Sequence, residues 1–329
     1  MREILNYLFE NNVLRRDEAR KILRGIASGN YNPVQVSAFL TVFRMRNITV
    51  DELEGFRDAM LELCIPVDLS AYNPVDLCGT GGDHKNTFNI STISSFVVAG
   101  AGLMVAKHGN YGVSSVCGSS NVLEYLGAKF TNDVEVIKKK METAGICFLH
   151  APLFHPAMKA VAPIRKDLGL ITFFNMLGPM VNPSFPQNQI VGVYNLELSR
   201  LYAYLYQKSS KNYYIVHSMD GYDEISLTSS FKIISSSGEK IISPENWGLS
   251  STTSADLYGG KDIQESAEIF MRILEGKGTD KQTDVVVANA ALAIHCVRNT
   301  LSISDCLLMA KESVQSGKAL QSFQKFTSN

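Results

Sequence analysis

The feature that most constrains the fold is a change of pattern near residue 75, where short apolar segments begin to alternate with longer amphipathic ones. Such alternation predicts a mainly parallel sheet flanked by helices on both faces, with ligands at the carboxyl ends of the strands. Two apolar segments around Ser237-Gly238 are typical of a hairpin. The expected strands are residues 75–77, 103–107, 146–150, 189–194, 213–217, 231–234 and 240–242, and the expected helices are 90–101, 120–126, 132–144, 155–168, 198–208, 262–275, 280–298 and 304–316.

The chain before this change shows helical patterns only. Asn32-Pro33 supplies a helix cap and a proline at the first helical position. Helices as short as these are marginal in isolation, so we expect them to pack on another domain or to dimerise. The predicted fold is therefore α/β, with a small helical domain at residues 1–70 and a larger α/β domain at residues 71–329. A segment near 170–188 is expected to pack with the helical domain.

The composition argues against several classes of protein. The 329 residues carry a formal net charge of −1, so no general positive field attracts nucleic acid or an anionic membrane. The six cysteines lack the spacing of zinc ligands, and so few thiols in so long a chain do not predict a disulfide framework. The start of the chain lacks the apolar region of a signal peptide, and the longest apolar run is too short to cross a bilayer. We expect a cytoplasmic protein that binds neither nucleic acid nor membranes.

A glycine-rich turn follows the first expected strand. Its sequence, Gly79-Thr80-Gly81-Gly82-Asp83, is neither a Walker loop nor a GxGxxG fingerprint, which weakens a nucleoside triphosphate or dinucleotide reading. Asn89-Ile90-Ser91-Thr92 follows at an expected helix start, where free N–H groups and the helix dipole favour phosphate. The alternative is that Asn89 or Ser91 only caps this helix. Together the two segments predict a site for a phosphate-rich ligand.

Two further polar segments follow other strands. In Lys107-His108-Gly109-Asn110, the lysine could neutralise a phosphate, and Asn110 offers a donor and an acceptor to a substrate. Asp223-Glu224 comes after the strand expected at 213–217. Adjacent carboxylates suit Mg²⁺, which prefers oxygen ligands, although such a pair on a loop can also be plain solvated charge. The residues alone leave both interpretations open.

These motifs occur in the order found in one enzyme family. GTGGD, NIST, KHGN, SS-x-x-GSS, HPAM-x-x-VAPIRKDLG and FN-x-LGP resemble the anthranilate phosphoribosyltransferases, which share a family with the pyrimidine nucleoside phosphorylases. The resemblance implies a small helical domain, a larger α/β domain, and a homodimer joined through the helical domains. It also implies transfer of the phosphoribosyl group of 5-phosphoribosyl 1-diphosphate to the amine of anthranilate, with Mg²⁺ as cofactor, in tryptophan biosynthesis.

The resemblance also implies a role for each matching residue. Phosphoribosyl diphosphate would contact Gly79, Gly82, Asp83, Thr87, Asn89, Ile90, Ser91, Thr92, Lys107, His108, Gly109, Asn110, Ser114, Ser115 and Ser119. Anthranilate would contact Gly79, Asn110 and Arg165, and the metal ligands would be Ser91, Asp223 and Glu224. Arg165 would oppose the anthranilate carboxylate, and Pro163 is expected to interrupt the helix just before it. No general acid or base is assigned, because the arylamine is already neutral near neutral pH.

Three alternatives remain open. A pyrimidine nucleoside phosphorylase would share KHGN and the serine-rich loop, a related transferase would act on another aromatic amine, and a non-catalytic relative would bind nucleic acid or another phosphate ligand. The segment Asp223-Glu224-Ile225-Ser226 and the APIR sequence that ends at Arg165 favour the anthranilate enzyme. Two positions depart from the family pattern. Tyr111 stands where members usually have arginine, and His84 stands where a small residue is common.

Overall fold

The computed structural model describes residues 1–112 and 117–328. The chain forms two compact units. The first consists of Met1–Val67 and Ala151–Pro183, and the second consists of Asp68–His150 and Ser184–Asn329.

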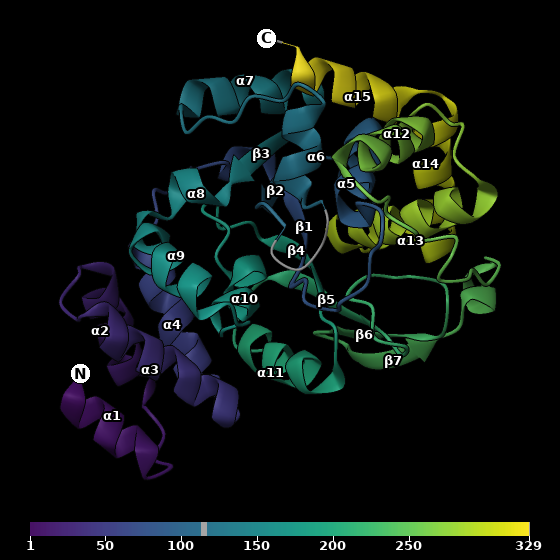
Figure 1. The fold of residues 1–329 in the computed structure, drawn as a ribbon. Helices are drawn as coiled ribbons and strands as arrows, with labels where there is room; N and C mark the ends of the chain where they lie inside the picture. Colours follow the sequence, from purple (N-terminus) through teal and green to yellow (C-terminus); the bar gives the residue numbers. More distant parts are fainter. Residues whose placement is uncertain (113–116, 329) are drawn as a thin grey trace. The chain divides into compact units, whose positions relative to one another are not determined.

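The first unit is a helical bundle (Figure 1), and a cluster of phenylalanines forms part of its core. Phe56 stacks on Phe173 with ring centroids 4.2 Å apart, and Phe43 meets both rings edge-on at 5.4 and 5.3 Å. Phe43 and Phe56 belong to the first sequence segment of this unit and Phe173 to the second, so this core joins the two segments. The helices are α1 (Arg2–Phe9), α2 (Arg16–Ala27), α3 (Pro33–Met45), α4 (Val50–Glu62), α8 (Ala151–Phe154), α9 (Pro156–Leu168), α10 (Phe174–Leu177) and η2 (Gly178–Met180).

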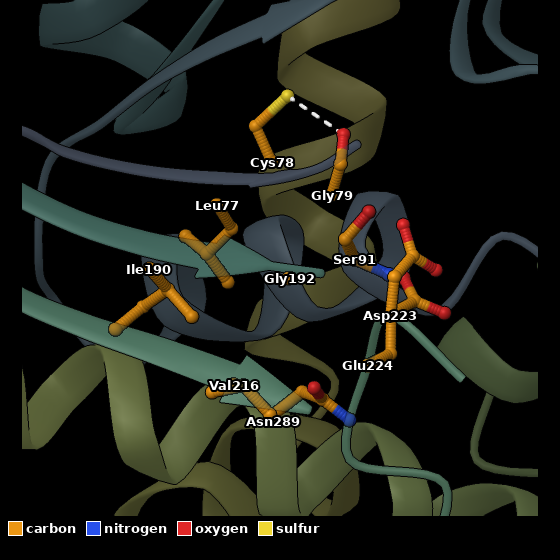
Figure 2. A pocket seen from close by; sticks show the side chains of 10 residues that line it. All are labelled: Leu77, Cys78, Gly79, Ser91, Ile190, Gly192, Val216, Asp223, Glu224 and Asn289. Atoms are coloured by element: carbon orange, nitrogen blue, oxygen red, sulfur yellow. Dashed lines mark hydrogen bonds between the residues drawn. The ribbon is translucent and has the colours of Figure 1, made fainter. Parts of the chain in front are cut away.

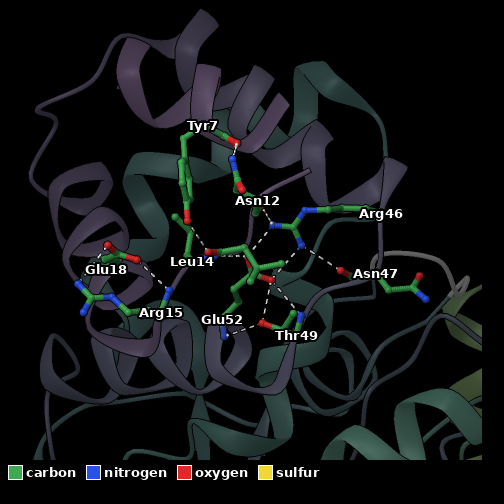
Figure 3. Close-up of polar contacts among 10 residues, drawn as sticks. Tyr7, Asn12, Leu14, Arg15, Glu18, Arg46, Asn47, Thr49 and Glu52 are labelled. Carbon is green, nitrogen blue, oxygen red and sulfur yellow. Dashed lines mark hydrogen bonds and ion pairs between the residues drawn. The ribbon is translucent and has the colours of Figure 1, made fainter. Parts of the chain in front are cut away.

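A buried carboxylate links the N-terminal helices of this unit. Glu52 accepts hydrogen bonds from the two terminal nitrogens of Arg46, at 3.0 and 2.5 Å, and from the N–H groups of Leu14 and Thr49, both at 2.9 Å (Figure 3). Burial raises the pKa of Glu52, but these hydrogen bonds together outweigh burial and lower the pKa below its ordinary value. The expected cap of α3 is also present, since the Asn32 side chain accepts from the N–H of Gln35 at 2.9 Å.

Two details of this unit differ from the sequence-based expectations. The segment beyond the N-terminal helices begins at Ala151 rather than near residue 170, because α9 packs against α2 and α3. The expectation that Pro163 interrupts its helix is wrong, since α9 runs unbroken from Pro156 to Leu168. A proline removes one N–H donor, and the helical turns on either side keep this helix continuous.

The second unit is built on a sheet whose strand order, among the described residues, is β3-β2-β1-β4-β5-β6-β7 (Figure 1). Neighbouring strands from β3 to β5 are parallel, and β6 and β7 continue the sheet as an antiparallel hairpin. This arrangement confirms the predicted, mainly parallel sheet. The strands are β1 (Val75–Gly79), β2 (Val105–Gly109), β3 (Ile146–His150), β4 (Asn188–Gly192), β5 (Asn212–Ser218), β6 (Phe231–Ser235) and β7 (Gly238–Ile242).

Helices cover both faces of this sheet. Tyr213 of β5 packs against Tyr206 of α11 (Leu196–Tyr206), and the next residue, Tyr214, donates to or accepts from His295 of α13 (Asp280–Val297) at 2.7 Å. Successive residues of a strand point to opposite faces, so α11 and α13 lie on opposite sides of β5. Burial of the α5 and α13 apolar faces forms much of the core.

The remaining helices of the second unit largely follow the sequence patterns. They are η1 (Ser70–Tyr72), α5 (Ile90–Gly100), α6 (Ser119–Tyr125), α7 (Val134–Ala144), η3 (Pro244–Trp247), α12 (Ile263–Leu274), α14 (Ile303–Gln315) and α15 (Lys318–Thr327). The sequence patterns do not predict α15, a short helix whose Phe323 and Phe326 enter the core beside Phe96. In the described ranges all six cysteines are free thiols, and no helix is long and apolar enough to cross a membrane.

Candidate active site

Two glycines at the carboxyl ends of neighbouring parallel strands form the base of the site. Gly79 ends β1, Gly192 ends β4, and the two residues pair directly. A Cβ atom on Gly192 would lie 1.5 Å from the carbonyl oxygen of Asp223, and one on Gly79 would lie 2.3 Å from its Oδ2. Because only glycine leaves this space, the segment that carries Asp223-Glu224 rests directly on the ends of β1 and β4. The connections from β1 and β4 lead in opposite directions along the sheet, the usual position for ligands in such folds.

Two hydrogen bonds connect the acidic segment to the predicted phosphate-binding segments. The N–H of Gly81 donates to Asp223 Oδ2 at 2.7 Å, and the N–H of Ser91 donates to Glu224 Oε1 at 2.9 Å. Figure 2 shows both carboxylates beside Ser91 at the end of the strand that carries Gly192. The structure therefore brings the acidic segment to two segments that precede it by more than 130 residues.

The carboxylates in this site destabilise one another's charged forms. Burial and the neighbouring charge of Asp83 raise the pKa of Asp223, against the opposing effect of the Gly81 hydrogen bond. Burial and the charge of Asp223 raise the pKa of Glu224, while the Ser91 hydrogen bond and the charge of Lys107 lower it. A cation bound among these groups would favour their charged forms and lower their pKa values, opposite to the effect of their mutual repulsion.

The chemistry of this donor set fits a hard divalent cation. Carboxylate and hydroxyl oxygens are what Mg²⁺ prefers, and Asp223, Glu224 and the Ser91 hydroxyl lie at one end of the sheet. Within the described ranges, no three carboxylate, imidazole or thiol groups converge closely enough to complete a set of ligands. Mg²⁺ commonly binds through one or two carboxylates together with water and substrate phosphates, so an incomplete protein set agrees with a metal that arrives with its substrate.

The N-terminus of α5 faces the same region. The Asn89 side chain does not cap this helix but donates to the carbonyl of Cys117 at 3.0 Å, while Ile90 and Thr92 are buried. The alternative that Asn89 only caps this helix is therefore wrong. The helix start brings the positive end of its dipole to the acidic segment, where the N–H of Ser91 donates to Glu224.

The turn between β1 and α5 contains three residues with positive φ. Gly81, Gly82 and His84 have φ values of 63°, 80° and 56° around Asp83. His84 occupies a left-handed conformation, which costs energy in any residue that carries a β-carbon. Asp83 accepts from the N–H of Lys85 at 3.0 Å, and Thr87 forms a bridge with Tyr258.

Lys107 lies beneath the site rather than at its surface. It is buried, and its Nζ donates to the carbonyl of Leu77 at 2.6 Å and to Ser91 Oγ at 3.4 Å. Its position places a positive charge behind Ser91 and Glu224. The next residue, His108, is also buried, and its N–H donates to Asp76 Oδ1 at 3.1 Å.

The segment after β2 is held by residues of α6 and β3. The Ser119 hydroxyl donates to the carbonyl of Asn110 at 3.2 Å, and a Cβ on Gly109 would meet Ser119 Oγ at 2.5 Å. Tyr111 packs edge-on against His150, with ring centroids 4.9 Å apart, and its hydroxyl lies 3.3 Å from Glu124. The aromatic ring thus anchors this segment. Ser114 and Ser115 lie outside the described residues.

Arg165 belongs to the first unit, unlike the other expected contact residues. Its guanidinium stacks over the ring of Phe174 at 5.3 Å and donates to Asn175 Oδ1 at 3.1 Å. Burial lowers the pKa of Arg165. These contacts within α9 and α10 fix the direction of the side chain, which argues against a freely solvated basic face.

Two residues beside the acidic segment were not predicted. Gly192 carried an available signal, because a glycine inside a strand pattern often marks a close approach of another backbone. Asn289 stands alone among apolar residues of α13, and a buried amide in such a run demands hydrogen-bond partners. Both residues line a pocket together with Leu77, Cys78, Gly79, Ser91, Ile190, Val216, Asp223 and Glu224 (Figure 2).

Comparison with known proteins identifies the relationship of this fold and site. Residues 71–320 match the model of the glycosyl transferase family α/β domain, and residues 2–64 match that family's helical bundle domain. The chain is 62% identical over 325 residues to the anthranilate phosphoribosyltransferase of Flavobacterium johnsoniae, covering 99% of this chain and 98% of the relative. It is 56% identical over 326 residues to that of Bacteroides thetaiotaomicron, with the same coverage of 99% and 98%.

Solved structures show the same relationship. The anthranilate phosphoribosyltransferase of Thermus thermophilus superposes with a TM-score of 0.91 at 31% identity, over 98% of both chains. The enzyme of Saccharomyces cerevisiae, in complex with phosphoribosyl diphosphate and magnesium, superposes with a TM-score of 0.88 at 29% identity, over 95% of this chain and 92% of that one. The chain belongs to the glycosyl transferase family with a helical bundle and an α/β domain, and within it to the anthranilate phosphoribosyltransferases.

Proposed function

We propose that this chain transfers the 5-phosphoribosyl group of 5-phosphoribosyl 1-diphosphate to the amine of anthranilate and releases diphosphate. The observation that carries this proposal is the junction of three segments at the ends of β1 and β4. Hydrogen bonds join the Asp223-Glu224 carboxylates to the glycine turn at Gly81 and to the start of α5 at Ser91. This junction holds cation-binding oxygens beside a glycine turn and a helix start, the kinds of element that bind anions, as a metal-associated diphosphate requires.

The diphosphate and phosphoribosyl groups would bind between the glycine turn, the start of α5 and the segment after β2. N–H groups of the turn and of the helix start would stabilise the negative charge that develops on the leaving diphosphate. The proposed contact residues are Gly79, Gly82, Asp83, Thr87, Asn89, Ile90, Ser91, Thr92, Lys107, His108, Gly109, Asn110, Ser114, Ser115 and Ser119.

Mg²⁺ would be held by Asp223, Glu224 and the Ser91 hydroxyl, and the yeast enzyme solved with magnesium supports Mg²⁺ as the cofactor. When bound, the ion supplies electrostatic stabilisation of the diphosphate leaving group. Lys107, buried 3.4 Å from Ser91 Oγ, would hold that hydroxyl toward the site and offset the charge of Glu224.

Anthranilate would contact Gly79, Asn110 and Arg165. The Arg165 guanidinium, oriented by Phe174 and Asn175, offers the paired donors that a carboxylate accepts. The yeast enzyme has also been solved with 4-fluoroanthranilate, which supports an aromatic amine as the acceptor.

The reaction breaks the bond between the anomeric carbon and the diphosphate oxygen and forms a bond from that carbon to the anthranilate nitrogen. The anomeric carbon passes through an oxocarbenium-like state, as in other glycosyl transfers. The arylamine attacks with its lone pair and then loses one proton to water or to the departing diphosphate. Because the amine is neutral from the start, positioning it beside the anomeric carbon can supply much of the rate without a strong general base.

The helical unit would have two roles in this proposal, namely closing the site and joining two copies of the chain into a homodimer. Sedimentation of the purified chain tests the dimer. A cytoplasmic location stays a prediction.

The activity is tested by the loss of anthranilate fluorescence on addition of phosphoribosyl diphosphate and Mg²⁺, with phosphorolysis of thymidine and uridine as parallel assays. We expect metal-dependent consumption of anthranilate and no phosphorolysis. Phosphorolysis without anthranilate consumption would instead establish a nucleoside phosphorylase, and DNA binding that weakens with salt, without any turnover, would establish a non-catalytic relative.

A further inference from the structure

The backbone of the acidic segment is held from outside at four successive carbonyl groups. The Ser218 hydroxyl donates to the carbonyl of Glu224 at 2.7 Å, and Asn289 Nδ2 donates to that of Ile225 at 2.9 Å. Thr252 then supplies two donors: its hydroxyl reaches the carbonyl of Ser226 at 2.8 Å, and its N–H reaches that of Leu227 at 2.9 Å. The three donor residues come from different parts of the second unit, so the shape of this segment depends on its neighbours.

Asn289 makes the most complete set of these contacts. Its Oδ1 accepts from the N–H of Ile225 at 3.1 Å while its Nδ2 donates to the carbonyl of the same residue. The second Nδ2 hydrogen reaches the carbonyl of Val285 at 2.8 Å, one turn earlier in α13. The side chain is 6% exposed. One amide group therefore satisfies both backbone groups of Ile225 and is itself oriented by the helix that carries it.

The residue that Asn289 holds comes directly after the two carboxylates. Fixing both backbone groups of Ile225 fixes the peptide bond to Glu224, and with it the origin of the Glu224 side chain. Asp223 is limited from the other side by Gly79 and Gly192, which leave no room for movement toward the strands. Figure 2 shows Asn289 reaching from α13 toward this segment, across from Gly192.

We propose that Asn289 is a positioning residue that holds Asp223 and Glu224 in the geometry needed to bind a divalent cation. It acts through the Ile225 backbone and does not itself touch the ion. The inference rests on the proposed function, which identifies magnesium diphosphate as the ligand of this site. Groups that orient metal ligands commonly affect metal affinity by about 10- to 100-fold when they are removed.

Asn289→Leu is the most direct test, because leucine has a similar volume and makes none of the three hydrogen bonds. We expect the dissociation constant for magnesium diphosphate, measured by titration calorimetry, to rise by about 10-fold or more. In turnover assays the Mg²⁺ concentration for half-maximal rate should rise by a similar factor, excess Mg²⁺ should restore most of the rate, and the KM for anthranilate should stay unchanged.

Two further variants separate positioning from general loss of packing. Ser313→Ala removes another buried hydrogen bond of the same helical layer, from its hydroxyl to the carbonyl of Val97 at 2.7 Å, without touching the acidic segment. It should leave magnesium diphosphate affinity unchanged. Asn289→Asp keeps an acceptor for the N–H of Ile225 and loses the donors, so its affinity for magnesium diphosphate should fall between that of Asn289→Leu and that of the unaltered chain.

The measurements distinguish failure of this inference from failure of the proposed function. Equal magnesium diphosphate affinity in folded Asn289→Leu and in the unaltered chain would refute the role of Asn289. A parallel fall in affinity in Ser313→Ala would also refute it, since the effect would then be general. An unaltered chain that binds magnesium diphosphate but does not consume anthranilate would refute the proposed function and leave the binding comparison valid.

Discussion

Replacement of Gly192 by alanine tests the most closely packed contact of the site. The added Cβ would lie 1.5 Å from the carbonyl oxygen of Asp223 and 2.7 Å from its carbonyl carbon. Contacts of a Cβ atom rarely fall below about 3 Å, so β4 and the acidic segment must separate by roughly 1.5 Å. A carbonyl group of the main chain cannot rotate away as a side chain can, and the movement therefore shifts the carboxylates that follow.

The size of the effect follows from this displacement. Misplacement of a catalytic group by about 1 Å can lower the rate by about 100-fold, so we expect kcat/KM of Gly192→Ala to fall by about 100-fold or more. Overpacking should also lower the free energy of unfolding by about 1–3 kcal/mol. Anthranilate fluorescence measures the first effect, and thermal unfolding followed by circular dichroism measures the second.

Two other glycines provide comparisons. A Cβ on Gly79 would clash only with the carboxylate of Asp223, at 2.3 Å, and this side chain can turn away if it gives up its bond to Gly81. Gly79→Ala should therefore be less harmful than Gly192→Ala. Gly25→Ala, whose Cβ would meet only the outer end of the Tyr31 ring in the first unit, should keep nearly full activity. Near-normal kcat/KM in a folded Gly192→Ala variant would refute the reasoning.

Three further substitutions have distinct expected outcomes. Arg165→Ala should raise the KM for anthranilate far more than the KM for phosphoribosyl diphosphate in steady-state assays, and equal effects would refute the assigned role. Tyr111→Phe removes only a weak bond to Glu124 and should change kcat/KM less than about 2-fold. Tyr111→Ala removes the ring that packs on His150 and should raise the KM for phosphoribosyl diphosphate several-fold. Similar effects of the two variants would contradict this anchoring role. Glu52→Gln should lower the free energy of unfolding by roughly 2–4 kcal/mol near neutral pH, because it leaves the Arg46 charge partly unpaired. The folded pKa of Glu52 lies below the unfolded value of about 4.3, so its stabilisation is complete above that pH and disappears as the pH falls through the folded pKa. Thermal melts should show the two proteins converging below about pH 4, and a constant difference would contradict the assignment.

The regular elements could be predicted because their signals are local. Apolar runs of strand length gave β1 to β5 their approximate positions, and the cap at Asn32 marked the start of α3. Pro163 was misjudged because a local rule for helix ends does not include the packing that keeps α9 continuous. The apolar residues of α15 recur at helical spacing, but the segment is short, and its helical structure depends on burial against α5.

The site could be predicted only in part. Motifs with dense glycines, hydroxyls and carboxylates stand out in the sequence, and the structure brings most of them to one end of the sheet. Gly192 and Asn289 do not belong to such motifs. Their importance arises from contacts with residues 223–225, which depend on how β4 and α13 pack and which no pattern within a short window records.

The distance in sequence between the site's partners has a consequence for how an active molecule is made. The bond from Gly81 to Asp223 joins residues 142 positions apart, and Asn289 reaches back 64 positions to Ile225. Contacts of such separation form slowly, and the N-terminal parts of a chain leave the ribosome first. A nascent chain therefore contains every glycine and serine motif long before it can assemble a working centre. After denaturation, enzymatic activity should accordingly return later than the circular dichroism signal of the helices. The return of activity should mark the point at which α13 has packed and the second unit is complete.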